Sequence, residues 1–292
     1  MKHKFLFILL FSLVLEGMVT TQAVAGDYVH QVNTLIGTKG TGLTSGYLYP
    51  GATYPYGMVQ FTPSYFSKRS GFVINQLSGG GCEHMGNFPT FPVKGKLKMS
   101  PDNILNYRIN ISEEKGHAGY YEVMVQEDIK AKLTVTERTG MASYEYPADQ
   151  QYGTIIIGGG ISATPIEQAA IVITAPNKCE GYAEGGNFCG LRTPYKVSFV
   201  AEFDTDAFET GTWKREELMP NTTFAEGEYS GVYFTFDVNK KKNIQYKIGV
   251  SYVSVENARE NLKAENAEWD FQKIQNQAEA KWNHYLGMIE VE

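Results

Sequence analysis

The sequence has little cysteine, no excess of positive charge and only one long hydrophobic run. Three cysteines in 292 residues exclude a disulfide-dense scaffold, and a chain of this length buries a substantial core without crosslinks. Lysine and arginine total 26 against 32 acidic residues, for a net charge of -6. Because nucleic-acid binding requires a basic face, we expect no nucleic-acid partner. The composition, with 42% hydrophobic and 20% charged residues, is typical of a folded globular protein.

The one hydrophobic run lies near the N-terminus, where two lysines precede the apolar residues 5–15. The Ala-Val-Ala sequence at residues 23–25 fits the small-x-small rule for signal peptidase, with cleavage before Gly26. We therefore predict a signal peptide over residues 1–25 and a secreted protein, periplasmic or extracellular. The run is too short to span a membrane comfortably, and no cysteine stands at the cleavage site. We expect no membrane anchor after cleavage.

The three cysteines leave the disulfide pattern open. Cys179 and Cys189 are a candidate disulfide in an oxidising compartment, although sequence separation does not establish the geometry that a disulfide needs. Cys82 would then be the odd thiol, a small packed residue. Zinc needs four ligands, or three and a water, and Cys82 and His84 have no partners at metal spacing. We therefore expect no metal site in this chain and interpret His84 as solvent-facing.

Apolar and polar residues alternate repeatedly after about residue 122, as in strands with one buried face. Such runs occupy residues 129–135, 195–203, 232–238 and 244–252. Turn-forming residues separate them, and no helical pattern lies between them. Because parallel strands need crossover helices, we predict a mainly β fold, an antiparallel sandwich.

The hydrophobic period changes near Val255. Residues 256–286 are rich in Ala, Glu, Asn, Gln and Lys, and apolar residues from Phe271 to Tyr285 recur at spacings of three and four, which predicts one or two helices. Asp270 is the predicted N-cap of the second helix. This helix either folds back on the sandwich or borders whatever follows, and the pattern favours neither.

Two glycine-rich segments are candidates for function. Residues 36–63 contain too much glycine and proline for a core element, which predicts an ordered loop. They match neither the phosphate-binding loop nor the dinucleotide fingerprint, so we reject nucleotide binding. Residues 77–89 include three consecutive glycines before Cys82, which allow the backbone to approach a ligand or another backbone closely. This second segment is a candidate rim of a binding site.

These segments carry a resemblance to a known family. The sequence Tyr49-Pro-Gly-Ala-Thr-Tyr-Pro-Tyr-Gly-Met-Val-Gln-Phe-Thr-Pro63 resembles a stretch near the start of family 92 glycoside hydrolases. Gly71-Phe72 and residues 77–89 resemble the glycine-cysteine loop that follows it. Residues 119–121, 129–140, 251–269 and 282–283 are also similar to the N-terminal domain of that family, in the same order. The resemblance covers nearly all of the chain after residue 25.

The resemblance implies a fold and an activity. The fold is a β-supersandwich of the galactose-mutarotase-like type, joined through linker helices to a helical (α/α) toroid. The activity is that of a calcium-dependent, inverting exo-α-mannosidase whose Glu acid and Asp base lie in the helical domain. Gly81 and Cys82 match the loop that faces the terminal mannose, and Tyr49 and Pro50 lie near the domain interface. Calcium belongs to the full-length enzyme, and none is predicted within this chain.

The family pattern also divides the chain. Residues 1–25 are the signal peptide, 26–254 the N-terminal β-sandwich domain, and 255–292 the linker helices and the start of a missing catalytic domain. No carboxylate here has the sequence context of a general acid or base, so we expect no catalytic residue and no hydrolysis by this chain alone. The expected partners are mannose-containing glycans and the helical catalytic domain, in cis or on a separate polypeptide.

Some positions depart from the family pattern, and they leave the preferred linkage open. Family members commonly have Gly-Asp where this chain has Gly86-Asn87, and many have histidines in place of Ile74 and Gln76. Two alternatives also remain. Beside the favoured reading of a mannosidase domain, the chain could be a stand-alone carbohydrate-binding protein without hydrolytic activity. In the other alternative it is a structural sandwich that docks to a partner through the helix at 271–285.

Overall fold

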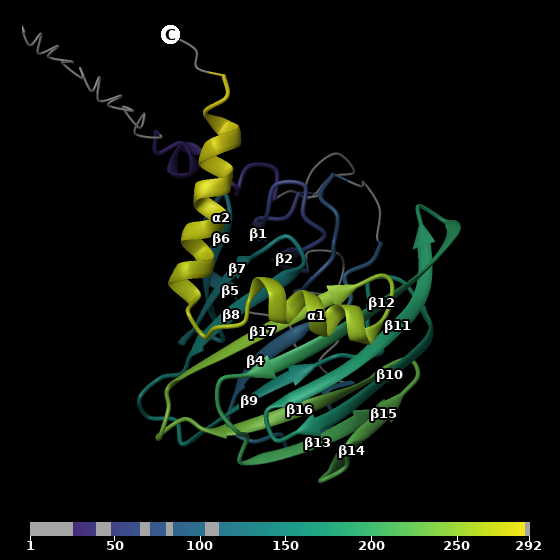
Figure 1. The fold of residues 1–292 in the computed structure, drawn as a ribbon. Coiled ribbons are helices and arrows are strands. Elements are labelled where there is room, and N and C mark those ends of the chain that lie inside the picture. The colour runs from purple at the N-terminus through teal and green to yellow at the C-terminus, as the bar shows by residue number, and fades with distance from the viewer. Residues whose placement is uncertain (1–25, 39–47, 65–70, 80–83, 103–110, 290–292) are drawn as a thin grey trace, which may run out of the picture.

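The computed structural model describes residues 26–38, 48–64, 71–79, 84–102 and 111–289. Two large β-sheets face each other, and two helices follow them in the chain (Figure 1). The predicted signal peptide lies outside the described residues. Across the described ranges, no helix combines the length and the apolar character that a membrane crossing would require.

The first sheet has eight strands among the described residues, in the order β1-β2-β3-β4-β9-β16-β13-β14. Their bounds are β1 Ala52–Thr53, β2 Gln60–Pro63, β3 Phe72–Val73, β4 Thr90–Lys94, β9 Tyr152–Ile157, β16 Ser230–Asp237, β13 Glu209–Lys214 and β14 Glu217–Pro220. The short strands β1 to β3 lie together at one edge of the sheet. Residues 54–59, which join β1 to β2, are therefore at that edge too.

The second sheet has nine strands among the described residues, in the order β15-β10-β11-β12-β17-β8-β7-β6-β5. Their bounds are β15 Phe224–Glu226, β10 Ile166–Ala175, β11 Lys178–Phe188, β12 Leu191–Phe203, β17 Asn243–Ser251, β8 Thr139–Glu145, β7 Ile129–Val135, β6 Tyr120–Val125 and β5 Ile111–His117. Every pairing of named strands in both sheets is antiparallel. The antiparallel fold predicted from period-two alternation is confirmed.

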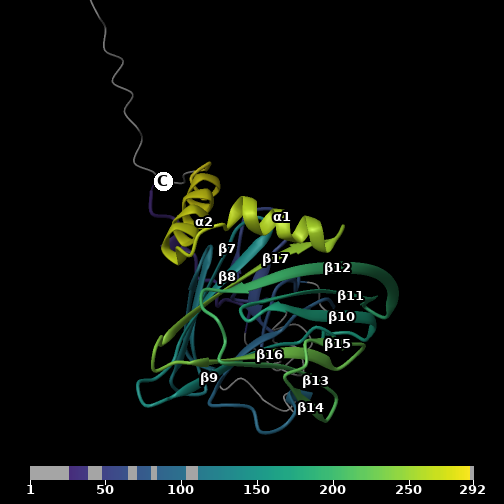
Figure 2. The ribbon, with the colours of Figure 1, turned by 60° about the horizontal axis from the view of Figure 1, so that its bottom comes forward.

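Aromatic side chains from the facing sheets form much of the core between the two layers seen in Figure 2. The ring of Phe203 on β12 lies 4.8 Å from that of Phe234 and 5.0 Å from that of Phe236, both on β16. Phe61 on β2 and Tyr246 on β17 make a similar contact at 6.4 Å. Each fully buried side chain of this size contributes about 1.5–3 kcal/mol to folding. This inter-sheet packing fixes the edges that carry the loops.

Helix α1 (Val255–Glu265) lies on the outer face of the nine-stranded sheet, against β17 and β12 (Figure 2). Ser254 caps it, because its side chain accepts a hydrogen bond from the backbone N–H of Asn257 at 3.1 Å. A Cβ atom on Gly249 would lie 2.5 Å from the carbonyl oxygen of Ala258. Glycine at this position of β17 therefore allows the helix to pack directly on the sheet.

Helix α2 (Phe271–Leu286) folds back on the sandwich, the first of the two alternatives given for it. The side chain of Asp270 accepts a hydrogen bond from the backbone N–H of Lys273 at 3.0 Å, so the predicted cap is confirmed. The indole Nε1 of Trp282 donates to the carbonyl oxygen of Thr53 on β1 at 2.7 Å. Figure 1 shows α2 beside β6 and β7, close to the N-terminal segment that contains the 3₁₀ helix η1 (Val29–Gln31).

The prediction of a loop over residues 36–63 is wrong in part. Residues 39–47 lie outside the described residues, but the described part contains β1 and β2, and Phe61 is a core residue with 1% exposure. A Cβ atom on Gly51 would lie 2.2 Å from the carbonyl oxygen of Phe61. The glycine that indicated a loop is thus required for close approach of the backbone beside these two strands.

Candidate functional site

A buried group of uncharged polar side chains lies in the connection between β3 and β4, within the predicted binding rim. Its members are Asn75, Gln76, His84 and Asn87, which we call the polar cluster, and each is at most 2% exposed. Gly81 and Cys82, the two rim residues taken from the resemblance, lie outside the described residues. The polar cluster therefore flanks the glycine-cysteine loop in sequence on both sides.

Asn75 and Asn87 form hydrogen bonds with each other and with two tyrosines of the second sheet region. The backbone N–H of Asn87 donates to Asn75 Oδ1 at 2.8 Å, and Asn75 Nδ2 donates to Asn87 Oδ1 at 3.0 Å. The hydroxyl of Tyr195 on β12 also donates to Asn87 Oδ1, at 2.8 Å, and Tyr252 accepts from Asn75 Nδ2 at 3.3 Å. These contacts bring the rim of one sheet against the ends of strands in the other.

The remaining amide groups of the polar cluster are unpaired. Within the described part of the chain, neither the Nε2 nor the Oε1 atom of Gln76 makes a hydrogen bond, and nor does Asn87 Nδ2. A buried amide without a partner costs about 1–3 kcal/mol. Such a group in a native structure calls for an explanation, and a ligand that both donates and accepts hydrogen bonds supplies one.

Every titratable group at the polar cluster is neutral near pH 7. Desolvation lowers the pKa of His84 from its ordinary value of 6.5, and its ring stacks on that of Phe188 with centroids 5.2 Å apart. Desolvation also raises the pKa of Tyr195 to about 12 and shifts the pKa of Tyr252 upward. The cluster can therefore exchange hydrogen bonds with neutral hydroxyl groups, and it contains no carboxylate for acid-base catalysis.

The structure places Tyr49 beside this region and Pro50 beside β5. The backbone N–H of Tyr49 donates to Ser78 Oγ at 3.2 Å, two residues after Gln76. Pro50 is also buried, and its carbonyl oxygen would lie 3.3 Å from a Cβ atom on Gly116 of β5. The role of Tyr49 and Pro50 at a domain interface stays a prediction.

The candidate disulfide between Cys179 and Cys189 is wrong. Cys179 is a free, fully buried thiol, whereas Cys189 is disulfide-bonded to a different cysteine. Cys179 is the second residue of β11 and Cys189 directly follows its last residue, so ten steps of about 3.3 Å separate them by roughly 30 Å. A disulfide requires Cα atoms about 4.4–6.8 Å apart. The sequence did not reveal that an extended strand joins them.

The interpretation of His84 as solvent-facing is also wrong, because its side chain is buried at 1% exposure. Its neighbours Glu83 and Met85 differ in polarity, and no periodic hydrophobic pattern runs through this glycine-rich segment to mark it as interior. The backbone around it has a specific shape, with Met85, Gly86 and Phe88 in the left-handed region at φ values of 46°, 71° and 54°. Only the glycine signalled that turn in advance.

Comparison with known proteins identifies the family. The family model described as the glycosyl hydrolase family 92 N-terminal domain matches residues 31–251. The chain belongs to glycoside hydrolase family 92. The resemblance inferred from the sequence is thereby confirmed, and the matched part is the N-terminal domain of that family.

Solved structures agree with this assignment. A family GH92 alpha-mannosidase from Bacteroides thetaiotaomicron matches with a TM-score of 0.76 at 25% identity, over 90% of this chain and 38% of that one. A family GH92 inverting mannosidase from strain VPI-5482 of the same species matches with a TM-score of 0.77 at 25% identity, over 91% and 37%.

A curated relative comes from Arthroderma benhamiae (strain ATCC MYA-4681 / CBS 112371) and is described as an uncharacterized secreted glycosidase. It is 26% identical over 320 residues, which cover 95% of this chain and 41% of that protein. The chain thus spans about two-fifths of the length of the relatives that it matches.

Proposed function

We propose that this domain supplies the loop side of the mannose pocket in a secreted, calcium-dependent, inverting exo-α-mannosidase. The acid and the base lie in a helical domain, which also carries the calcium. Membership of family 92 supports the glycosidase activity, and the two mannosidases of similar structure support the substrate class. The secreted relative supports export of the protein.

The polar cluster is the observation that carries this proposal. The unpaired amide groups of Gln76 and Asn87 offer donors and acceptors at neutral pH, which complement the hydroxyl groups of a sugar. The exposed ring of Phe188, stacked on His84, offers a flat apolar surface to a pyranose. The cluster itself contains no carboxylate, so hydrolysis requires groups from elsewhere.

Gly81 and Cys82 remain the residues that we assign to the face of the terminal mannose. They stand between Ser78 and His84 in sequence, so the loop that contains them starts and ends beside the polar cluster. In this proposal the polar cluster orients the loop or contacts the sugar directly, and the helical domain closes the other side of the pocket. Mannose-containing glycans are the proposed ligands.

The proposal is tested with an aryl α-mannoside, the chain alone, and the chain joined to a family 92 helical domain. We expect turnover only by the joined protein, loss of turnover on chelation of calcium, and inversion at the anomeric carbon by NMR. The variant Gln76→Ala should lower kcat/KM at least tenfold, because it removes hydrogen-bonding groups from the pocket. The exposed control Gln272→Ala on α2 should leave kcat/KM unchanged.

Two results would contradict the proposal. Turnover by the chain alone would place an acid and a base within it. An unchanged kcat/KM in Gln76→Ala, with the fold intact, would remove the polar cluster from the pocket. If the joined protein is inactive but the chain alone retains mannose-containing glycans on a column, the domain is instead a carbohydrate-binding protein.

A further inference from the structure

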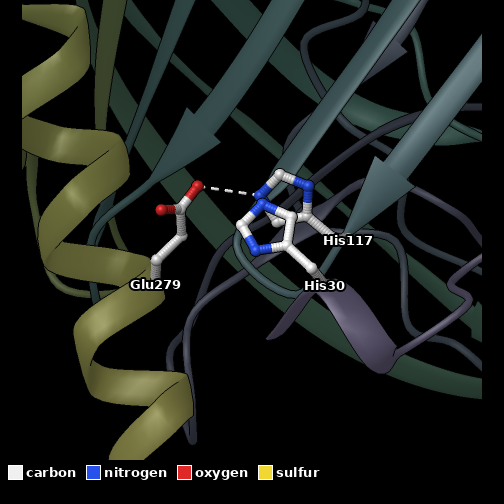
Figure 3. A group of neighbouring side chains, drawn as sticks. All are labelled: His30, His117 and Glu279. Atoms are coloured by element: carbon white, nitrogen blue, oxygen red, sulfur yellow. Dashed lines mark hydrogen bonds and ion pairs between the residues drawn. The ribbon is translucent and has the colours of Figure 1, made fainter. Parts of the chain in front are cut away.

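Three potential metal ligands converge where the N-terminal segment, the β5–β6 hairpin and helix α2 meet. They are His30 on η1, His117 at the end of β5 and Glu279 on α2, and their ligand atoms all lie within 4.8 Å of one another. Figure 3 shows the Glu279 carboxylate directed at the two imidazole rings, with a dashed contact to His117. The His117 Nε2 to Glu279 Oε1 distance is 2.8 Å.

A fourth residue orients one of these ligands. Asp27 Oδ1 lies 2.6 Å from Nδ1 of His30, so the carboxylate favours a proton on Nδ1 and leaves Nε2 as the metal-binding nitrogen. A histidine that binds a metal through one nitrogen commonly donates its other N–H to a carboxylate in this way. The ring of His117 is held by stacking on Tyr120, with centroids 5.0 Å apart.

The distances are compatible with a small tetrahedral ion after a limited adjustment. Zinc–nitrogen and zinc–oxygen bonds of about 2.0–2.2 Å place neighbouring ligand atoms roughly 3.3 Å apart. The His117 to Glu279 contact would have to open by about 0.5 Å to reach this spacing. His30 moves most easily, because its side chain is 55% exposed, against 15% for His117 and 17% for Glu279.

The ligand types select the metal. Two imidazoles and one carboxylate suit borderline divalent ions such as Zn²⁺, and the exposed side of His30 leaves room for a water as fourth ligand. Calcium prefers a shell of oxygen ligands, so this site differs in chemistry from the calcium site proposed for the helical domain. No sequence motif indicated it, since 162 residues separate His117 from Glu279.

We propose that His30, His117 and Glu279 bind one Zn²⁺ ion, with Asp27 as the positioning residue for His30. The ion crosslinks the N-terminal segment and helix α2 to the sandwich. Because Zn²⁺ binds only the folded arrangement of these three elements, it stabilises the native chain by mass action.

The test uses the tag-free chain after chelator treatment, titrated with ZnCl₂ or CaCl₂ in a calorimeter and followed in parallel by thermal unfolding. We expect one equivalent of Zn²⁺ to bind and to raise the midpoint of unfolding, with no effect of Ca²⁺. His117→Gln and His30→Gln should each weaken Zn²⁺ binding more than tenfold, and Asp27→Asn by about tenfold or more. The control variant His284→Gln lacks an exposed histidine of α2, the helix that carries Glu279. This variant should bind Zn²⁺ as tightly as the unmodified chain.

The proposal fails if the folded chain takes up no Zn²⁺, or if His284→Gln weakens binding as much as His117→Gln does. His30→Gln changes an exposed side chain, so it remains informative should His117→Gln not fold. Equal Zn²⁺ affinity in His30→Gln and in the unmodified chain would also overturn it.

Discussion

At the scale of the residue, His84 shows how burial determines chemistry. Its imidazole is almost completely enclosed, and desolvation penalises its charged form. The folded chain therefore takes up a proton at this histidine less readily than the unfolded chain, whose histidines titrate near 6.5. The difference in proton binding couples the stability of the domain to pH.

The direction of this coupling follows from proton binding. Below pH 6.5 the unfolded state binds more protons at His84 than the folded state does, so the free energy of unfolding falls as the pH falls. One such group contributes at most about 1.4 kcal/mol per pH unit. We expect His84→Asn to lose less stability than the unmodified chain between pH 7.5 and 5.5, measured by urea unfolding.

The control for this prediction is His284→Gln, which removes an exposed histidine of α2 and leaves His84 in place. All three proteins have the same carboxylates, so the difference between variants isolates the histidine. Identical pH dependence in His84→Asn and the unmodified chain would contradict the assignment of a buried, neutral His84.

At the same scale, the sequence predicted residues whose role is local and missed those whose role depends on distant segments. Asp270 was predicted as a cap because a cap is set by the residues just after it. His84 and Cys179 were misjudged because burial depends on strands elsewhere in the chain. The polar cluster follows the same rule, as its anchors Tyr195 and Tyr252 lie far from it in sequence.

At the scale of the element, Lys247 links β17 to the connection between the two helices. Its ammonium group donates to the carbonyl oxygens of Asn266 at 3.0 Å and Ala267 at 3.1 Å, and it lies 4.2 Å from the centre of the Trp269 ring. These carbonyls follow the C-terminal end of α1, where a positive charge is favourable. Desolvation lowers the pKa of Lys247 and so opposes this contact.

We predict that Lys247→Met loosens the connection at residues 266–270 with little effect on overall stability. The variant loses two hydrogen bonds and a 3.6 Å ion pair with Glu202, which keeps Lys178 as its partner. It also removes the cost of a buried charge. Amide hydrogen exchange of residues 266–270 should accelerate several-fold, while the free energy of unfolding changes by less than about 1 kcal/mol.

Lys196→Met is the matched control, because Lys196 on β12 pairs with Glu184 on β11 at 2.6 Å and does not contact the helix connection among the described residues. It should leave hydrogen exchange at residues 266–270 unchanged. Unaltered exchange in Lys247→Met would mean that the connection is held by other contacts.

The strands were predictable where large apolar residues alternate with polar ones. Strands β7, β12, β16 and β17 were predicted from their regular apolar positions. Strand β11 was not, because small residues such as Gly181 and Ala183 occupy its inward positions. A Cβ atom on Gly181 would lie 2.1 Å from the carbonyl oxygen of Ala170. Close approach to β10 therefore requires a glycine here, and that glycine interrupts the apolar alternation by which a strand is predicted.

At the scale of the whole molecule, the N-terminal segment is held by the last helix of the chain. Asn283 Oδ1 accepts hydrogen bonds from the backbone N–H groups of Tyr28 and Val29, both at 2.9 Å. It thus caps η1 from α2. We therefore expect these segments, at opposite ends of the described chain, to open together.

We predict that Asn283→Ala releases residues 26–31. Two partly buried N–H groups lose their acceptor, at a cost of about 1–3 kcal/mol. Hydrogen exchange at Tyr28 and Val29 should accelerate by one to two orders of magnitude when measured in chelator, which excludes any effect of bound metal. Asn276→Ala, on the exposed face of the same helix, should leave this exchange unchanged, and equal protection in both variants would contradict the prediction.

Contacts between segments far apart in the chain could not be predicted from the sequence. The alternation indicates which face of a strand is buried but not which distant segment covers it. The convergence of His30, His117 and Glu279 depends on three such placements at once. The resemblance predicted the fold and the family correctly because it rested on several motifs that occur in the family order along the whole domain.

The buried thiol of Cys179 can serve as a natural probe of unfolding of the domain. The group sits at 0% exposure, and desolvation raises its pKa well above the ordinary range, so a maleimide or disulfide reagent finds no reactive thiolate there in the native state. We expect alkylation at this position to require separation of the two sheets, so that its rate follows global unfolding. Mass spectrometry of that one modification can follow the lifetime of the folded sandwich without an engineered label.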